Sequence, residues 1–208
     1  MDSYLIDTLN VDLFTFSKPQ KYKDTNLMIC KIKNDSKDVL LQFPKMKVTA
    51  VDEKSIELEF MNEKGYNKKM FNVLSSIDQT VISHITQNSQ EWFGKEIPEQ
   101  FIGQMYNKFI KSPRSSEHKC TVNFVISKNS EIMDKHNEPA SVSKGNTLEC
   151  ISQMKYLIFS KDSCYITWEL CTAKCTQRVT RVPKFGFIED PFDITEDPDP
   201  EPELITFF

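Results

Sequence analysis

The chain has 208 residues, of which 39% are hydrophobic and 27% are charged, and its 26 Lys and Arg against 30 Asp and Glu give a net charge of −4. This composition is ordinary for a globular protein with a core of its own, and only five glycines make collagen-like and glycine-loop phosphate-binding interpretations poor starting points. No apolar run approaches the roughly 20 residues of a membrane helix. The start, MDSYLIDTLNVDLF, lacks the layout of a secretory signal peptide, so we expect an intracellular, reducing location and no secretion.

The sequence of the first half of the chain predicts an arm followed by strands. Residues 1–24 form a mixed amino-terminal arm. Short runs of alternating or continuous apolar residues then predict strands at 26–34, 38–44, 47–51 and 55–60. Turn residues such as Asp52-Glu53 separate these runs. This region therefore predicts an antiparallel meander.

The spacing of apolar residues changes between residues 67 and 89. There they recur at intervals of three and four, which predicts a helix. Gly94 is a natural helix terminator, and a second helix is expected from Pro98 to Lys111. Strands return at 119–127, 148–160 and 163–175, with a long hairpin loop at 128–146.

The order of these elements predicts the fold class. Strands, two helices and strands again suggest a mostly β protein with two helices (α+β), arranged as an OB-like antiparallel barrel of about five or six strands with the helices inserted between the strand halves. A plain α+β sandwich remains the alternative.

The charge is divided unevenly along the chain. Residues 189–208 hold eight acids and no base, and removing these from the 30 acids leaves 22 against 26 bases in residues 1–188. We therefore expect one mildly basic, β-rich domain at 1–188, and a flexible acidic carboxy-terminal tail at 189–208 in which prolines block helix and sheet. On charge alone, a polyanion partner for the body and a merely solubilising tail both remain open.

Recognised catalytic motifs are absent from the sequence. Neither GxSxG, HExxH nor GxxxxGK[ST] occurs, and His84 is expected on a helix surface rather than as a base. The six cysteines fit free thiols better than a disulfide framework, and Cys164, Cys171 and Cys175 lack the CxxC spacing of a metal site. The sequence therefore predicts a protein that is not an enzyme, with no cofactor and no metal.

Three segments interleave basic residues with aromatic rings, a pattern that suits binding of single-stranded nucleic acid because cations contact phosphates and rings stack on bases. These segments are FTFSKPQKYKD, YNKFIKSPRSSEHK and AKCTQRVTRVPKFGF. The predicted nucleic-acid-binding residues are Lys18, Lys21, Tyr22, Lys23, Lys108, Lys111, Arg114, Trp168, Lys174, Arg178, Arg181 and Lys184. Trp168 could face the core or a groove. Trp92 is expected to be a buried anchor for the helices.

The closing stretch DPFDITEDPDPEPELITFF, after a basic β-rich body, resembles the acidic, aromatic-ended tails of single-stranded DNA-binding proteins of bacteria, bacteriophages and large DNA viruses. NSQEWFGKEIPEQFIGQMYNKFIK resembles a segment of proteins of nucleocytoplasmic large DNA viruses. The resemblance implies a sequence-tolerant single-stranded DNA-binding protein for viral replication or repair, acting in the viral factory of the host cytoplasm or in the nucleus.

The same resemblance implies that the tail recruits replication proteins. The residues that would contact them are Asp197, Asp199, Glu201, Glu203, Phe207 and Phe208. The tail differs from the tails that it resembles, in which acids adjoin the final aromatic residue, since here residues 204–206 separate the acids from the final aromatics. A homodimer stays open. The alternative function is a virion structural or assembly protein that uses the tail as a protein contact, which would have no affinity for nucleic acid.

Overall fold

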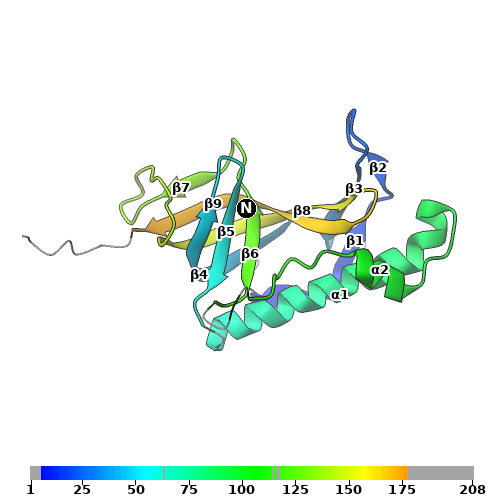
Figure 1. Ribbon diagram of the computed structural model, residues 1–208, viewed down its shortest axis with the longest axis horizontal. Coiled ribbons are helices and arrows are strands. Elements are labelled where there is room, and N and C mark those ends of the chain that lie inside the picture. Colours follow the sequence, from blue (N-terminus) through cyan, green and yellow to red (C-terminus); the bar gives the residue numbers. More distant parts are fainter. Residues whose placement is uncertain (1–5, 63, 114, 116–117, 178–208) are drawn as a thin grey trace, which may run out of the picture. The chain divides into compact units, whose positions relative to one another are not determined.

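The computed structural model describes residues 6–62, 64–113, 115 and 118–177 (Figure 1). Within these residues the strands are β1 (Phe14–Phe16), β2 (Gln20–Lys21), β3 (Met28–Asn34), β4 (Val39–Val51), β5 (Ser55–Phe60), β6 (Thr121–Val125), β7 (Glu131–Met133), β8 (Thr147–Phe159) and β9 (Cys164–Thr176). The α-helices are α1 (Gly65–Phe93) and α2 (Glu99–Met105), and two 3₁₀ turns, Ile6–Thr8 and Val11–Leu13, precede β1. The predicted domain boundary after residue 188 and the acidic tail lie outside the described residues.

Five strands form a closed ring of pairings. β4 pairs with β5, β5 with β6, β6 with β9, β9 with β8, and β8 with β4. Every pairing is antiparallel except that of β6 with β9, which is parallel and consists of one residue pair, Val125 opposite Glu169. A small five-stranded ring of this kind is the OB-like arrangement. Outside the ring, β3 pairs with β8, β1 and β2 pair with β3, and β7 pairs with β9.

The predicted fold class is therefore confirmed as mostly β with two helices. α1 and α2 lie in the chain between β5 and β6, which is the predicted insertion between strand halves (Figure 1). The described sheet is mixed rather than purely antiparallel and has nine strands, more than expected. The additional strands arise because the amino-terminal arm and the loop predicted at 128–146 both contribute backbone to the sheet.

The regular spacing of apolar residues accounts for helix α1. The residues that recur every three or four positions are buried in the same core as the strands: Met70, Leu74, Ile77, Val81 and Ile85. The helix runs beneath the strands in Figure 1, with α2 beside it. It ends where Gly94 takes a φ of 72°, and the Gly94 N–H donates to the carbonyl of Gln90 at 3.0 Å. Glycine adopts this left-handed conformation without strain.

Strand β4 joins two predicted strands into one. Pro44 has no N–H to donate, which is why the sequence pattern stops there. In the structure the pairing of β4 with β8 shifts register between Phe43 and Met46, and this bulge accommodates the proline within a continuous strand.

Helix α2 is shorter than predicted, because the expected helix reached Lys111 and the observed one ends at Met105. After Tyr106 the backbone pairs with strands instead. The Asn107 N–H donates to the Cys164 carbonyl at 2.8 Å, and Lys111 exchanges backbone hydrogen bonds with Thr121 at 2.8 and 3.1 Å. Residues 107–111 are therefore held against β9 and β6, and we call them the 107–111 segment.

Trp92 connects the end of α1 to the sheet. Its half-buried ring lies 6.2 Å from the ring of Phe159 and 5.6 Å from that of His84. His84, expected on the helix surface, is half-buried between Trp92 and Phe16, and burial lowers its pKa.

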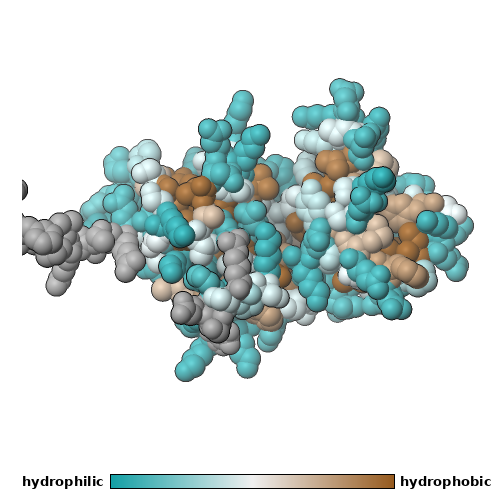
Figure 2. All heavy atoms as spheres, viewed as in Figure 1, coloured by the Kyte–Doolittle hydropathy of each residue, from teal (hydrophilic) through white to brown (hydrophobic). Residues whose placement is uncertain are grey.

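Apolar side chains reach the exterior in several places on the face shown in Figure 2, and one of these lies over α2 and the end of α1. Phe101, at 57% exposure, is the most exposed large hydrophobic residue in the described chain.

Among the described residues, no helix combines the length and the apolar character needed to span a membrane.

Candidate nucleic-acid interface

The pairing register of β3, β8 and β9 places six side chains on one face of the sheet. Lys31 lies opposite Tyr156, which lies opposite Thr167. In the neighbouring row, Ile29 lies opposite Ile158, which lies opposite Tyr165. Directly opposed residues project to the same side of a sheet, as do residues two apart along a strand. All six are exposed or half-buried, so the two rows form an outward surface, which we call the open face.

A hollow of about 200 Å³ continues the open face from β9 toward β6. Tyr165 and Thr167 form one wall of this hollow, and the 107–111 segment supplies Lys108 and Lys111. Asn123 and Val125, which are exposed on β6, complete the rim. The backbone pairing of the segment with β9 and β6 fixes the positions of both lysines beside Tyr165.

The lysines of this surface are available to an external anion. Among the described residues, Lys31, Lys108 and Lys111 form no salt bridge, although the charge of Lys108 acts on the buried Asp78. Lys155, in contrast, pairs with Glu169. This pairing raises the pKa of Lys155 and, against the opposing effect of burial, lowers that of Glu169. An unpaired ammonium beside an aromatic ring is the arrangement that contacts a phosphate next to a stacked base.

Two of the twelve predicted nucleic-acid residues, Lys108 and Lys111, lie in the hollow, and Trp168 forms its floor. Trp168 is only 1% exposed, and its ring lies 5.4 Å from that of Phe43 and 5.4 Å from that of Phe109. Neighbouring rings therefore occupy its surface, so Trp168 supports the hollow from the core rather than offering a face to a base. Its Nε1 atom has no hydrogen-bond partner among the described residues.

The amino-terminal group of predicted residues lies at the β1–β2 corner and not on the open face. Lys21 is opposite Met28, which is opposite the buried Phe159, so register places Lys21 toward the other side of the sheet. The Lys18 ammonium is 3.7 Å from a carboxylate oxygen of Glu91. Lys23 lies 5.3 Å from the ring centre of Tyr22, so these two predicted residues contact each other.

Lys174 is separated from the hollow along β9. In the sheet it lies opposite Glu149 of β8 and Met133 of β7, and it follows Tyr165 by nine residues. At about 3.3 Å per residue the separation is roughly 30 Å. The predicted residues Arg114, Arg178, Arg181 and Lys184, and the predicted partner-binding residues of the tail, lie outside the described residues.

The sequence reasoning missed Lys31, Tyr156 and Tyr165. Lys31 lies in a run predicted as a strand, and both tyrosines alternate with buried residues in predicted strands, Tyr156 before Leu157 and Tyr165 before Ile166. That alternation was a signal that the tyrosines face outward. Their proximity to Lys31 could not be read from the sequence, because it depends on the pairing of β3 with β8.

The cysteines and the possible metal ligands of the described residues can be placed as well. The six cysteines are free thiols, as expected, and burial raises the pKa of Cys30 and of Cys150 to about 12. No group of three or more metal-ligating side chains occurs in the part of the chain that the structure describes.

Comparison with known proteins gives a family but no function. A family model matches residues 44–187, which is more than half of the chain. The chain belongs to DUF5871, a family of unknown function. The match covers β5, α1, α2 and β6–β9, so the hollow lies within the family's region. No curated protein matches this DUF5871 chain.

Solved structures with a similar fold include bacteriophage proteins. The C-terminally truncated single-stranded DNA-binding protein from bacteriophage Enc34 is 15% identical, with a TM-score of 0.39, and the match covers 78% of this chain and 95% of that one. Its structure in complex with single-stranded DNA is 14% identical, with a TM-score of 0.38, and covers 77% and 94%. The single-stranded DNA-binding protein gp2.5 of bacteriophage T7 is 6% identical, with a TM-score of 0.45, and covers 66% and 85%.

Proposed function

We propose that this protein binds single-stranded DNA without catalysing a reaction and with little sequence preference. One observation carries the proposal: three ammonium groups without a described carboxylate partner surround two tyrosine rings on one face of the sheet and in its adjoining hollow. A single strand presents unstacked bases and phosphates together, whereas a duplex keeps its base faces covered. The similar bacteriophage proteins are named for the same ligand, but the proposal rests on this chain's own residues.

The geometry of the open face suits consecutive nucleotides. Tyr156 and Tyr165 are diagonal neighbours, because Tyr156 is opposite Thr167 and Tyr165 stands two residues before it. Diagonal neighbours in an antiparallel pair lie roughly 7–8 Å apart. Two bases of one strand can therefore stack on the two rings while Lys31 on one side and Lys111 on the other contact the backbone. Every base has a flat face, so such binding tolerates any sequence.

A titration of labelled oligo-dT and of a duplex at about 50 and 200 mM salt tests the proposal. We expect tight binding of the single strand, weak binding of the duplex, and a strong loss with salt. The double variant Lys31→Ala/Lys111→Ala should flatten the salt dependence by about two phosphate contacts. Lys95→Ala/Lys144→Ala, at two exposed lysines elsewhere, is the matched control. No affinity for the single strand would reject the proposal and favour the virion structural alternative.

We further propose that the acidic segment 189–208 recruits replication proteins. Its eight carboxylates without a base suit a partner surface rich in lysine and arginine. Deleting it changes the net charge from −4 to about +4, since eight negative charges are removed. We expect the shortened protein to bind DNA several-fold more tightly, because its field no longer repels phosphates, and to lose its protein partners. Unchanged or weaker DNA binding would contradict the electrostatic part.

The proposed setting is the replication of a nucleocytoplasmic large DNA virus, in the host cytoplasm or nucleus. The resemblance of the segment NSQEWFGKEIPEQFIGQMYNKFIK to proteins of such viruses motivates this part. Immunofluorescence in infected cells, with labelled viral DNA, would test it, and a distribution unrelated to replicating DNA would count against it.

A further inference from the structure

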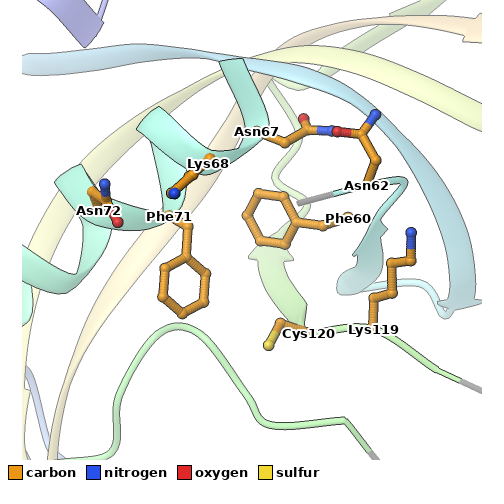
Figure 3. A pocket seen from close by; sticks show the side chains of 8 residues that line it. All are labelled: Phe60, Asn62, Asn67, Lys68, Phe71, Asn72, Lys119 and Cys120. Atoms are coloured by element: carbon orange, nitrogen blue, oxygen red, sulfur yellow. The ribbon is translucent and has the colours of Figure 1, made fainter. Parts of the chain in front are cut away.

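A second cavity, of about 380 Å³, lies between the first turns of α1, the end of β5 and the residues that lead into β6 (Figure 3). Its volume falls within the range of small-molecule sites. It shares no lining residue with the hollow of the open face. The lining residues are Phe60, Asn62, Asn67, Lys68, Phe71, Asn72, Lys119 and Cys120.

A buried acceptor that lacks a donor lies at the edge of the cavity. Asn67 is 7% exposed, and its Oδ1 atom has no hydrogen-bond partner in the part of the chain that the structure describes. The Asn67 side chain extends along the edge of the cavity toward Asn62 (Figure 3). A buried acceptor without a partner is unfavourable, and a turn of the Asn67 carboxamide toward the cavity would let an N–H or O–H group of a ligand donate to it.

Two rings provide apolar surface in the same cavity. Phe60 projects from the end of β5 and Phe71 from α1, and both rings point into the space between the two elements (Figure 3). Phe71 is 39% exposed, so part of its ring is in contact with solvent. A flat ligand ring can cover this surface.

Positive charge borders the cavity. Lys119 is held in place by a hydrogen bond of 2.6 Å from its ammonium to the Met61 carbonyl. Lys68 is exposed and has no carboxylate partner among the described residues. The amino terminus of α1 also lies here, without a side-chain cap and without an acid in its first turn. The exposed N–H groups and dipole of a long helix favour an anion at this end.

We propose that this cavity binds a nucleoside monophosphate unit. The base would lie against Phe71, donate an N–H to Oδ1 of Asn67, and exchange hydrogen bonds with the neighbouring carboxamides, which have the donor and acceptor pair that recognises base edges. The phosphate would lie near Lys68 and the first turn of α1. The unit is either a free nucleotide or the terminal nucleotide of a strand. The inference does not depend on DNA binding by the open face.

Titration of the full chain with dAMP, dCMP, dGMP, dTMP, deoxyribose 5-phosphate and inorganic phosphate, followed by NMR or calorimetry, tests the site. At least one nucleotide should bind about 10-fold more tightly than either phosphate without a base. Phe71→Ser and Lys68→Glu should each weaken that binding about 10-fold or more. Phe101→Ser and Lys95→Glu, at an exposed ring and an exposed lysine elsewhere, should leave it unchanged.

The role of Asn67 has its own variant. Asn67→Leu keeps the branched shape and the number of heavy atoms of the side chain, with somewhat larger volume, but removes the acceptor. We expect folding to be retained, since an unpaired polar atom disappears, and the discrimination between bases to be lost. If this variant unfolds, the Phe71 and Lys68 variants still decide the question.

A short oligonucleotide with or without a 5′-phosphate distinguishes the two sources. If Lys68→Glu weakens only the phosphorylated oligonucleotide, the site takes a strand end. If it weakens mononucleotides alone, the site takes free nucleotides. Equal binding of phosphate and nucleotides, no binding at all, or wild-type affinity in both variants would overturn the proposal. Tyr156→Ala reports separately on the open face, so a failure at one site does not imply a failure at the other.

Discussion

The outer surfaces of β5 and of β8–β9 belong to the same ring of strands, but they differ in whether their charged side chains have partners within the protein. On β5 the outward residues are Glu57 and Glu59, each only 8% exposed. Thr49 donates to Glu57 at 2.8 Å, and the Lys119 backbone N–H donates to Glu59 at 3.1 Å. On the open face and in its hollow, Lys31, Lys108 and Lys111 have no carboxylate partner among the described residues. The acids of β5 have hydrogen-bond donors within the protein, whereas the lysines of the open face and its hollow are exposed and form no salt bridge among the described residues.

This difference indicates where on the ring the proposed binding would take place. OB-folds commonly bind ligands over the second and third strands of the ring, which here are β5 and β6. The β5 part of that surface carries buried acids, which repel phosphates. The open face and its hollow instead extend from β3 across β8 and β9 to β6, where cations and rings are exposed.

The strongest test removes the rings of the open face. Tyr156→Ala with Tyr165→Ala should weaken binding of oligo-dT by about 1–3 kcal/mol for each base that loses its stacking partner. Fluorescence anisotropy measures the affinity. Phe101→Ala, at an exposed ring on α2, is the control and should bind like the wild type. Wild-type affinity in the double variant would remove the basis for the open face.

The second test concerns Asp78, a buried acid behind the 107–111 segment that accepts a hydrogen bond of 2.7 Å from Tyr106. Burial raises the pKa of Asp78 from 3.8 to about 6, although this hydrogen bond opposes the shift. The protonated carboxyl is therefore favoured in the folded state. Its contribution to stability is complete below about pH 4 and is lost as the pH rises through about 6.

Asp78→Asn should therefore flatten the pH dependence of the unfolding free energy between about pH 4 and 7, by up to about 3 kcal/mol. The amide oxygen can still accept from Tyr106. Urea unfolding at several pH values measures this, with Asp162→Asn on an exposed turn as the control. A variant that keeps the wild-type slope would show that Asp78 is not responsible.

A third test gives the open face the charge of β5. Thr167→Glu places a carboxylate between Tyr156 and Tyr165, and we expect affinity for oligo-dT to fall about 10-fold at low salt through repulsion of phosphates. Thr176→Glu, at the exposed end of β9, introduces the same charge away from the hollow and should change affinity much less. Equal losses in both variants would indicate a general charge effect.

The smallest effect is expected at Glu59. Burial raises the pKa of Glu59, but hydrogen bonds from the Lys119 backbone and His118, with Lys47 nearby, outweigh it and hold the pKa below its usual value. Glu59→Gln should lower the unfolding free energy at pH 7 by about 1 kcal/mol. Because the pKa is lowered, this difference should disappear as the pH falls below about 4. DNA affinity should not fall, and a large loss would place β5 in the interface.

The sequence predicted the elements that are set by local periodicity. The α1 stripe from Met70 to Ile85 and the two long strands β8 and β9 follow from spacing alone. It could not show that the 107–111 segment leaves the helix, because the partners of Asn107 and Lys111 are Cys164 and Thr121, far along the chain. Such pairings compete with helix formation and are decided only in the folded protein.

The candidate site was predicted in part. Lys108 and Lys111, which line the hollow, were predicted because basic and aromatic residues cluster in the chain around them, and their role in binding is untested. Lys18, Lys21 and Lys23 lie at the β1–β2 corner and Lys174 at the far end of β9, apart from Lys108 and Lys111, and their part in binding stays a prediction. Clustering in the sequence does not amount to clustering on a surface when strands separate the residues. The tail residues stay a prediction.

The closure of the ring through the single pair Val125 and Glu169 has a kinetic consequence. A contact between two strands that consists of one residue pair can open without breaking the remainder of the sheet, so amide hydrogens of β6 and of the facing part of β9 should exchange with solvent sooner than those of β4 and β8. A polymer lying across the hollow would span this junction and oppose its opening. Ligand-induced slowing of exchange at Val125 would then report occupancy without any label on the DNA.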